Sequence, residues 1–153
     1  MENKDEQYQL VLNQAKALMD GESDTIANLA NVSALLKETF NFWWVGFYLR
    51  QNDELVLGPF QGPVACTRIP KGKGVCGDAF ELKKSIKVDN VHEYPGHIAC
   101  SSASNSELVV PLFDGDEVVG VLDIDSENYE YFDQKDQSYM EQLCSLISHK
   151  CFE

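Results

Sequence analysis

The sequence predicts a single α+β domain: a central antiparallel sheet with N- and C-terminal helices packed on one face. Helical periodicity is strongest at the two chain ends, and two strand–turn–strand segments lie between them. No repeat, low-complexity tract or linker divides the 153 residues. A chain of this length buries roughly 70% of its unfolded surface, so its core needs neither a disulfide nor a metal. Residues 1–153 are therefore expected to form one domain.

Two helices are expected at the N-terminus. Apolar residues recur at helical spacing from Asp5 to Met19, and Gly21 ends that segment. Ser23 or Asp24 can cap a second helix. The first apolar stripe is Tyr8, Val11, Leu12, Ala15, Leu18 and Met19. The second is Ile26, Leu29, Ala30, Leu36 and Phe40.

A hairpin is expected next, with strands at 42–50 and 54–60 around a short polar turn. The segment 62–77 is rich in glycine and contains two prolines, which predicts a loop leading into a short helix that ends near Lys83. Residues 86–88 are expected to form a third strand. These elements place the middle of the chain in a sheet.

The remaining elements are a long loop, a second hairpin and a final helix. Segment 89–106 has little periodicity, and a loop of that length could cover a pocket. Strands are expected at 107–113 and 117–124. Asp133, three residues before Asp136, can cap the final helix. Its apolar stripe is Met140, Leu143, Ile147 and Cys151.

The charge excludes several classes of partner. The chain has 25 acidic and 12 basic side chains, a formal net charge of −13 at pH 7. Such a field repels the phosphates of nucleic acids and of anionic lipids. No apolar run approaches the ~20 residues of a membrane-spanning helix, and residues 1–9 do not resemble a secretory signal. We expect a cytoplasmic protein that binds neither nucleic acid nor membranes.

Five cysteines need an explanation, because a reducing compartment disfavours permanent disulfides. Cys144 lies beside the stripe of the final helix and is expected to be a small buried hydrophobe. Cys151, near the end of that helix, is expected to have no role. The other three, Cys66, Cys76 and Cys100, lie in segments rich in glycine and serine, where they could be buried thiols, metal ligands or redox groups.

A zinc site and a catalytic Cys–His pair are the two alternatives for these thiols. Cys100 follows His97 by three residues and His92 is near, but the chain has no Cys-x-x-Cys pair and the spacing is poor for zinc. No metal is therefore expected. A pair formed by Cys100 and His97 stays open, because the sequence does not tell whether the imidazole faces the thiol or water.

Acidic and aromatic residues form two further groups. Strand alternation places Asp123 and Asp125 on one face with Val119 and Val121, and Glu107 opens the neighbouring strand. The two aspartates either share a pocket or mark where the strand emerges into solvent.

Trp44, Gly46 and Tyr48 share a face of the first strand, and the glycine leaves space beside the aromatic rings. These rings form either core packing or the walls of a ligand slot.

Seven short motifs resemble the GAF-domain free methionine-R-sulfoxide reductases. They are FWWVGFY at 42–48, GPFQG at 58–62, GKGVCG at 72–77, VDNV at 88–91, HIAC at 97–100, SNSE at 104–107 and VLDIDS at 121–126. The similarity covers nearly the whole chain. Three cysteines and the aromatic run distinguish these motifs from those of ordinary GAF sensors. The resemblance implies a GAF-like fold.

The resemblance also implies an activity: thiol-dependent reduction of free L-methionine-(R)-S-oxide to methionine, without a cofactor and with thioredoxin as the reductant. By similarity, Cys100 is the nucleophile, Cys66 the resolving thiol that forms a disulfide with it, and Cys76 a secondary or recycling thiol. The sequence does not rank Cys100 against Cys76 as the attacking group.

By the same similarity Trp44 and Tyr48 are pocket walls. Reduction of a sulfoxide requires an acid to protonate its oxygen, and either Glu107 or Asp125 could serve. Asp123 could stay charged and hold the substrate ammonium, while backbone N–H groups of 101–104, including Ser101 and Ser102, could take its carboxylate.

A non-catalytic GAF module that senses a small molecule is the alternative function. GAF domains often pair through helices, so a homodimer is a further expectation of the resemblance.

Overall fold

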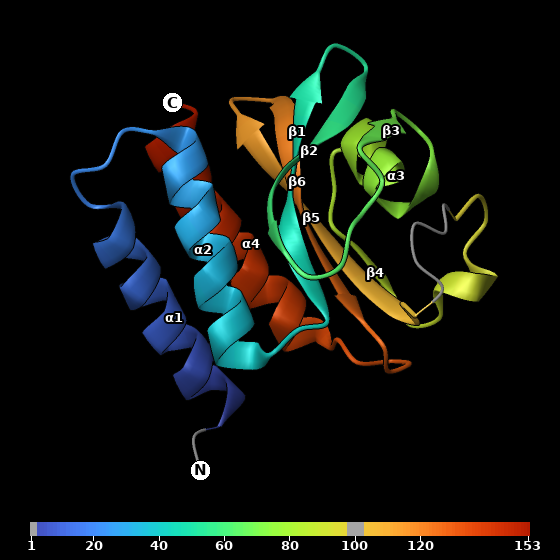
Figure 1. Cartoon of the computed structure of the whole chain (residues 1–153), viewed down its shortest axis with the longest axis horizontal. Coiled ribbons are helices and arrows are strands. Elements are labelled where there is room, and N and C mark those ends of the chain that lie inside the picture. Colours follow the sequence, from blue (N-terminus) through green and yellow to red (C-terminus); the bar gives the residue numbers. More distant parts are fainter. Residues whose placement is uncertain (1–2, 98–102) are drawn as a thin grey trace.

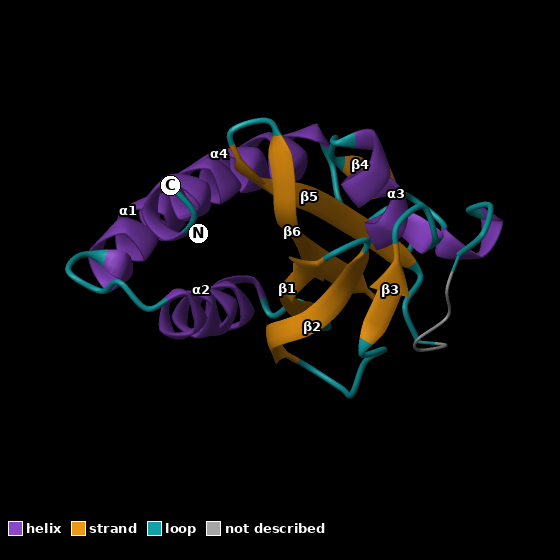
Figure 2. Cartoon of the chain, turned by 90° about the horizontal axis from the view of Figure 1, so that it is seen from above, coloured by secondary structure: helices purple, strands orange, loops and turns teal. Residues whose placement is uncertain are grey.

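The computed structural model describes residues 3–97 and 103–153. Its six strands form one antiparallel sheet in the order β3-β2-β1-β6-β5-β4 (Figure 1). Helices α1, α2 and α4 lie on one side of this sheet and α3 lies on the other (Figure 2). The predicted α+β class and the placement of the terminal helices on one face are confirmed.

Helices α1 (Lys4–Met19) and α2 (Thr25–Phe40) begin at side-chain caps. Asp24, one of the two predicted caps, accepts a hydrogen bond from the backbone N–H of Ala27 at 2.9 Å. The buried residues of α1 are Tyr8, Val11, Ala15 and Met19, and the buried apolar residues of α2 are Leu29, Val32 and Leu36. No described helix has both the length and the apolar character needed to cross a membrane.

Three residues predicted for the apolar stripes are exposed instead: Leu18, Ile26 and Ala30. Helix α1 contacts the rest of the protein mainly through α2 and α4, so its buried stripe is narrow. Helix α2 packs on β1 and β2. Successive helical residues are turned by about 100°, which directs Ala30 away from the face that buries Leu29.

The first hairpin joins β1 (Trp44–Gln51) to β2 (Glu54–Gln61). The predicted loop at 62–77 is wrong in two places, because it contains β3 (Arg68–Pro70) and the start of α3 (Gly74–Leu82). β3 has three residues and, among the described strands, pairs only with β2. A strand this short gives no alternation in the sequence, so tertiary pairing creates it.

The other half of the sheet consists of β4 (Ile86–Val88), β5 (Ser106–Asp114) and β6 (Glu117–Ser126). A short 3-10 helix, η1 (Val91–Glu93), interrupts the predicted long loop.

The predicted face of Val119 is wrong. The pairing of β5 with β6 shifts register between Leu112 and Phe113, which face Gly120 and Val118. Val119 therefore packs against the helix-side core, whereas Val118 and Val121 join the cluster on the α3 side. Irregular pairing of this kind reverses the face of one residue without ending the strand.

Two apolar clusters, one on each face of the sheet, make up the core. Val45 and Phe47 point to the cluster beneath α1, α2 and α4, whereas Trp44 and Tyr48 point to the cluster beneath α3. This alternation is the period of two that a strand imposes on its side chains. It leaves the α3 side with the aromatic residues that border the candidate site.

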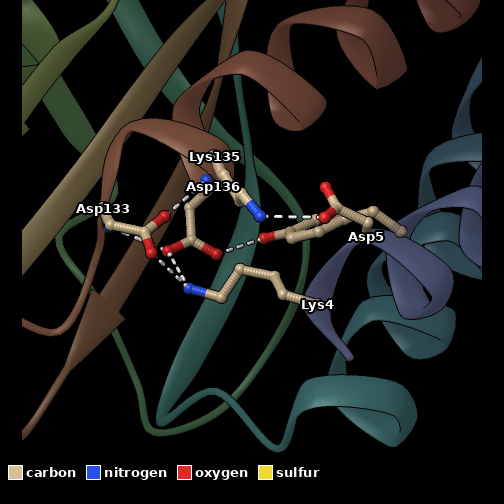
Figure 3. Close-up of polar contacts among 6 residues, drawn as sticks. Lys4, Asp5, Asp133, Lys135 and Asp136 are labelled. Atoms are coloured by element: carbon tan, nitrogen blue, oxygen red, sulfur yellow. Dashed lines mark hydrogen bonds and ion pairs between the residues drawn. The ribbon is translucent and has the colours of Figure 1, made fainter. Parts of the chain in front are cut away.

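Helix α4 (Gln134–Cys151) begins at the predicted capping box of Asp133 and Asp136. Figure 3 shows that Lys4 of α1 reaches both carboxylates, at 2.9 and 3.0 Å. Tyr8 donates a hydrogen bond to Asp136 at 2.6 Å. Partial burial raises the pKa of Asp133, but hydrogen bonds from Lys4 and the Asp136 backbone outweigh it and lower the pKa to about 2. These contacts tie the two chain ends together.

Candidate active site

A pocket lies on the α3 side of the sheet, where β1, β5 and β6 meet the N-terminal end of α3. It brings together most of the predicted site residues that the structure describes. The predicted residues at the pocket are Trp44, Tyr48, Cys76, Glu107, Asp123 and Asp125. They come from three strands and one helix, so the pocket exists only once the sheet and α3 have assembled.

Strand pairing brings the three carboxyl groups together. Glu107 on β5 is paired with Asp125 on β6, and Val109 is paired with Asp123. Glu107 and Asp123 are each 6% exposed, whereas Asp125 is partly exposed. The aspartates therefore line a pocket rather than marking a strand end in solvent.

The environment of the carboxyl groups favours their protonated forms. Burial, followed by repulsion from the neighbouring aspartates, raises the pKa of Glu107 well above its ordinary value. Burial and the charge of Asp123 do the same for the pKa of Asp125. Burial also raises the pKa of Asp123, but hydrogen bonds with Glu107 and Cys76 oppose that increase. Asp123 is thus the member best suited to carry a charge.

Cys76 lies in the first turn of α3 and is 4% exposed. Its Sγ lies 3.9 Å from Oε2 of Glu107. Burial raises the pKa of the Cys76 thiol well above its usual range, and the charges of Asp123, Glu107 and Asp125 raise it further. A thiolate at Cys76 is consequently disfavoured in the resting protein.

Cys66 lies between β2 and β3 and is half-buried. It is disulfide-bonded, and its carbonyl oxygen accepts a hydrogen bond from the hydroxyl of Tyr48 at 2.9 Å. Cys100, Ser101 and Ser102 lie outside the described residues, so their predicted roles stay predictions.

The two cysteines of α4 are free. Cys144 is buried in the helix-side core, as predicted, and burial raises the pKa of its thiol. Cys151 is partly buried, with its Sγ 3.8 Å from Nδ2 of Asn28.

The aromatic residues are both core packing and pocket wall. Trp44 stacks on Tyr48 with ring centroids 6.0 Å apart and on Phe60 with centroids 5.2 Å apart. The indole N–H of Trp44 donates to the carbonyl oxygen of Pro63 at 3.0 Å. Gly46 does not leave an empty slot, because Phe60 and Trp44 fill the space: a Cβ at position 46 would lie 2.9 Å from Cη2 of Trp44.

Three further polar residues line the pocket, and of these only Lys73 was not a candidate from the sequence. Ser104 is 7% exposed and its hydroxyl donates to Oδ1 of Asp125 at 3.5 Å. Lys73 and His97 also line the pocket, and burial lowers the pKa of His97, which favours the neutral imidazole. Lys73 belongs to the sequence motif at 72–77, but no feature of that motif shows which way its side chain points.

The comparisons with known proteins agree with this geometry. The family model of the GAF domain matches residues 23–149. The chain is 53% identical to GAF domain-containing protein A of Dictyostelium discoideum, over 96% of this chain and 94% of the relative. It is 49% identical to a free methionine-R-sulfoxide reductase of Escherichia coli, over 95% of this chain and 88% of the relative.

A solved structure gives the same assignment. The free methionine-R-sulfoxide reductase of Neisseria meningitidis, whose crystal structure holds its substrate, is 49% identical to this chain and superposes with a TM-score of 0.96. The alignment covers 98% of this chain and 91% of that one. The chain therefore belongs to the GAF-domain free methionine-R-sulfoxide reductase family, a family of oxidoreductases.

Proposed function

We propose that residues 1–153 form a single GAF-like domain that reduces free L-methionine-(R)-S-oxide to L-methionine. The observation that carries this proposal is the group of Glu107, Asp123 and Asp125 in one pocket, beside a thiol and two stacked aromatic rings. Relatives and a substrate-bound structural neighbour that are named for this activity support it. A pocket that favours protonated carboxyl groups suits a substrate whose oxygen must gain a proton as its bond to sulfur weakens.

Glu107 and Asp125 supply the acid. A thiol can attack the sulfoxide sulfur only if the sulfoxide oxygen is protonated or strongly hydrogen-bonded, because negative charge builds up on that oxygen as the S–O bond weakens. The raised pKa of each carboxyl group favours its protonated form. Ser104 donates to Asp125, which holds that side chain in place.

The remaining pocket groups match the other parts of the amino acid. Trp44 and Tyr48 offer an apolar wall for the S-methyl end. Asp123 can accept the substrate ammonium, because its Oδ1 is buried without a hydrogen-bond partner among the described residues. Lys73 brings a positive charge to the pocket for the substrate carboxylate, together with the backbone N–H groups of 101–104.

Three thiols complete the cycle. The Cys100 sulfur attacks the sulfoxide sulfur, the oxygen moves to Cys100 as a sulfenic acid, and methionine leaves. The Cys66 thiol then condenses with the sulfenic acid, which forms a disulfide and releases water. Cys76 acts as a secondary thiol, because its raised pKa and burial disfavour a resting thiolate. The disulfide-bonded state of Cys66 supports its part in this cycle.

Thioredoxin is the proposed reductant: its dithiol is oxidised as the enzyme disulfide is reduced, so electrons and protons balance. A reducing cytoplasm is the compartment that fits this cycle. A homodimer formed through helices is compatible with the proposal.

The test is a reductase assay with each sulfoxide epimer, coupled to NADPH through thioredoxin reductase and thioredoxin. The native chain should consume NADPH with the R epimer only. Cys100→Ser should abolish even a single turnover, whereas Cys66→Ser should release one equivalent of methionine and then stall. Cys151→Ser, a change at the end of α4, is the matched control and should behave like the native chain.

Two outcomes would contradict the proposal. A Cys100→Ser variant that still turns over would remove the assigned nucleophile. Binding of methionine sulfoxide without any methionine release would favour the alternative function, a sensor module.

Because the pocket must enclose both the ammonium and the carboxylate, an N-acetylated, amidated sulfoxide should not be reduced.

A further inference from the structure

We propose that Cys76, Glu107 and Asp123 form a binding site for a borderline-soft divalent cation, with Zn²⁺ as the model ion. This is not a cofactor site: a cation held there would occupy the pocket and inhibit the enzyme. The inhibitory part of the inference rests on the proposed reductase function. Binding itself does not.

The geometry provides three donor atoms from three different elements. Cys76 lies on α3, Glu107 on β5 and Asp123 on β6. One ligand atom of each lies within 4.8 Å of the other two. Ligands 2.0–2.3 Å from one zinc ion lie about 3.5 Å apart in a tetrahedral arrangement, so the donors must approach one another by no more than about 1.3 Å.

The chemistry of the donors fits zinc better than calcium or magnesium. Zinc binds thiolate sulfur and carboxylate oxygen, whereas the two harder cations require oxygen ligands alone. Three protein ligands leave a fourth position for water, an arrangement that zinc tolerates. On binding, the S–H bond of Cys76 and the O–H bond of the Glu107 carboxyl group break, both protons pass to solvent, and S–Zn and O–Zn bonds form, with no change of oxidation state.

A second observation points to a ligand at this place. Oδ1 of Asp123 is buried and has no hydrogen-bond partner within the part of the chain that the structure describes. The Asp123 side chain is 6% exposed and borders the pocket. A buried carboxylate oxygen without a partner is costly, which favours a bound cation or the ammonium of a substrate.

Occupancy of this site would exclude the substrate. The cation would take Asp123, the proposed ammonium site, and Glu107, one of the two proposed proton donors. It would also hold Cys76 as a thiolate. Methionine sulfoxide and the cation should therefore compete for the pocket.

These three ligands differ from the ligands that sequence spacing indicates. The sequence spacing directs attention to Cys100 with His97 and His92, or to three cysteines together. In the folded protein the donors of Cys76, Glu107 and Asp123 converge although 31 and 16 positions separate neighbours along the chain.

Cobalt(II) is the sharpest probe, because thiolate ligation gives a charge-transfer band in the near ultraviolet. The full chain, reduced with a phosphine, is titrated with Co²⁺ and then with Zn²⁺, which should displace the cobalt. We expect the native chain to bind one equivalent of Co²⁺. The charge-transfer band should be lost in the Cys76→Ser variant. The band should persist in the Cys66→Ser/Cys100→Ser double variant and in the control Cys151→Ser.

The carboxylates are tested separately. Glu107→Gln and Asp123→Asn should each weaken Zn²⁺ binding at least tenfold in competition with a fluorescent chelator, while Asp116→Asn, in the exposed turn of the second hairpin, should not. Circular dichroism establishes that each variant is folded. A band that survives in Cys76→Ser, or equal zinc affinity in all variants, would overturn the proposal.

Inhibition is measured last. Zn²⁺ should raise the methionine sulfoxide concentration that gives half of the maximal single-turnover rate without lowering that maximal rate, in assays of the reduced chain without thioredoxin. An inactive chain that still shows the Cys76-dependent cobalt band would refute the reductase function and leave the metal site standing. An active chain without such a band would refute the metal site and leave the reductase function standing.

Discussion

The Sγ of Cys76 lies 3.9 Å from Oε2 of Glu107, and both side chains are buried. One residue opens a helix and the other lies at the start of a strand on the adjoining sheet. Strand pairing places Asp125 opposite Glu107. A thiol and acidic groups are therefore held in one pocket by backbone geometry, not by neighbouring positions in the sequence.

The proton donors should be essential to the chemical step. Glu107→Gln or Asp125→Asn should lower kcat by about 10²–10⁴, the usual contribution of general acid catalysis. The measurement is methionine release at saturating substrate in the thioredoxin-coupled assay, quantified by chromatography. Asp116→Asn, which removes an exposed carboxylate in a turn, is the control and should retain native kcat. Native kcat in both site variants would show that neither group donates the proton.

Reductase activity should also fall as pH rises. The pKa values of Glu107 and Asp125 are raised, so these donors keep their protons to a higher pH than ordinary carboxyl groups do. We expect kcat to decline on the alkaline side, through the raised pKa of the donor. A kcat that is independent of pH over the range in which the fold is intact would contradict the assignment.

The Glu107 carboxyl group should make stability depend on pH. Its pKa is higher in the folded chain than in the unfolded chain, so the folded state holds the proton more tightly and stability falls as pH rises above the unfolded value. Glu107→Gln removes this loss. Relative to the native chain, the variant should become more stable as pH rises above the ordinary pKa of a glutamate, as measured by urea unfolding at pH 5 and at pH 8. An equal difference at both pH values would contradict the raised pKa.

Gly46 is required for the aromatic wall. An alanine Cβ there would lie 2.8 Å from Cα of Phe60 and 2.9 Å from Cη2 of Trp44. Gly46→Ala should therefore cost about 1–3 kcal/mol of unfolding free energy and raise the KM for substrate. Gly58→Ala, on the neighbouring strand, is the milder control because its nearest contact would be 3.1 Å away. Equal stability of the two variants would refute this close packing.

Tyr8 should stabilise the junction of α1 and α4 more than Tyr139 does. The Tyr8 hydroxyl is buried and donates to Asp136, whereas the hydroxyl of the partly exposed Tyr139 donates to Asp5. Tyr8→Phe leaves a buried carboxylate short of a donor, which should cost about 1–3 kcal/mol. Tyr139→Phe should cost much less. Thermal unfolding of the Tyr8→Phe and Tyr139→Phe variants measures these two losses of stability.

Local chemistry was sufficient to predict most elements. Asp24 and the Asp133–Asp136 capping box mark helix starts because their side chains satisfy free backbone N–H groups. Short polar turns between apolar runs mark both hairpins. The motifs resembling a reductase family carried the functional assignment, and the comparisons confirm the family. β3 was missed because its three residues depend on pairing with β2.

Residue order alone thus determined the helix caps, the hairpins and the types of side chain available for redox chemistry, because each depends on neighbours within a few positions. Tertiary structure decided the rest. Register irregularity turned Val119 toward the helices, and helix packing left Ile26 exposed. The acidity of Glu107, Asp123 and Asp125 changed only when long-range pairing removed water and brought like charges together, which no local pattern encodes.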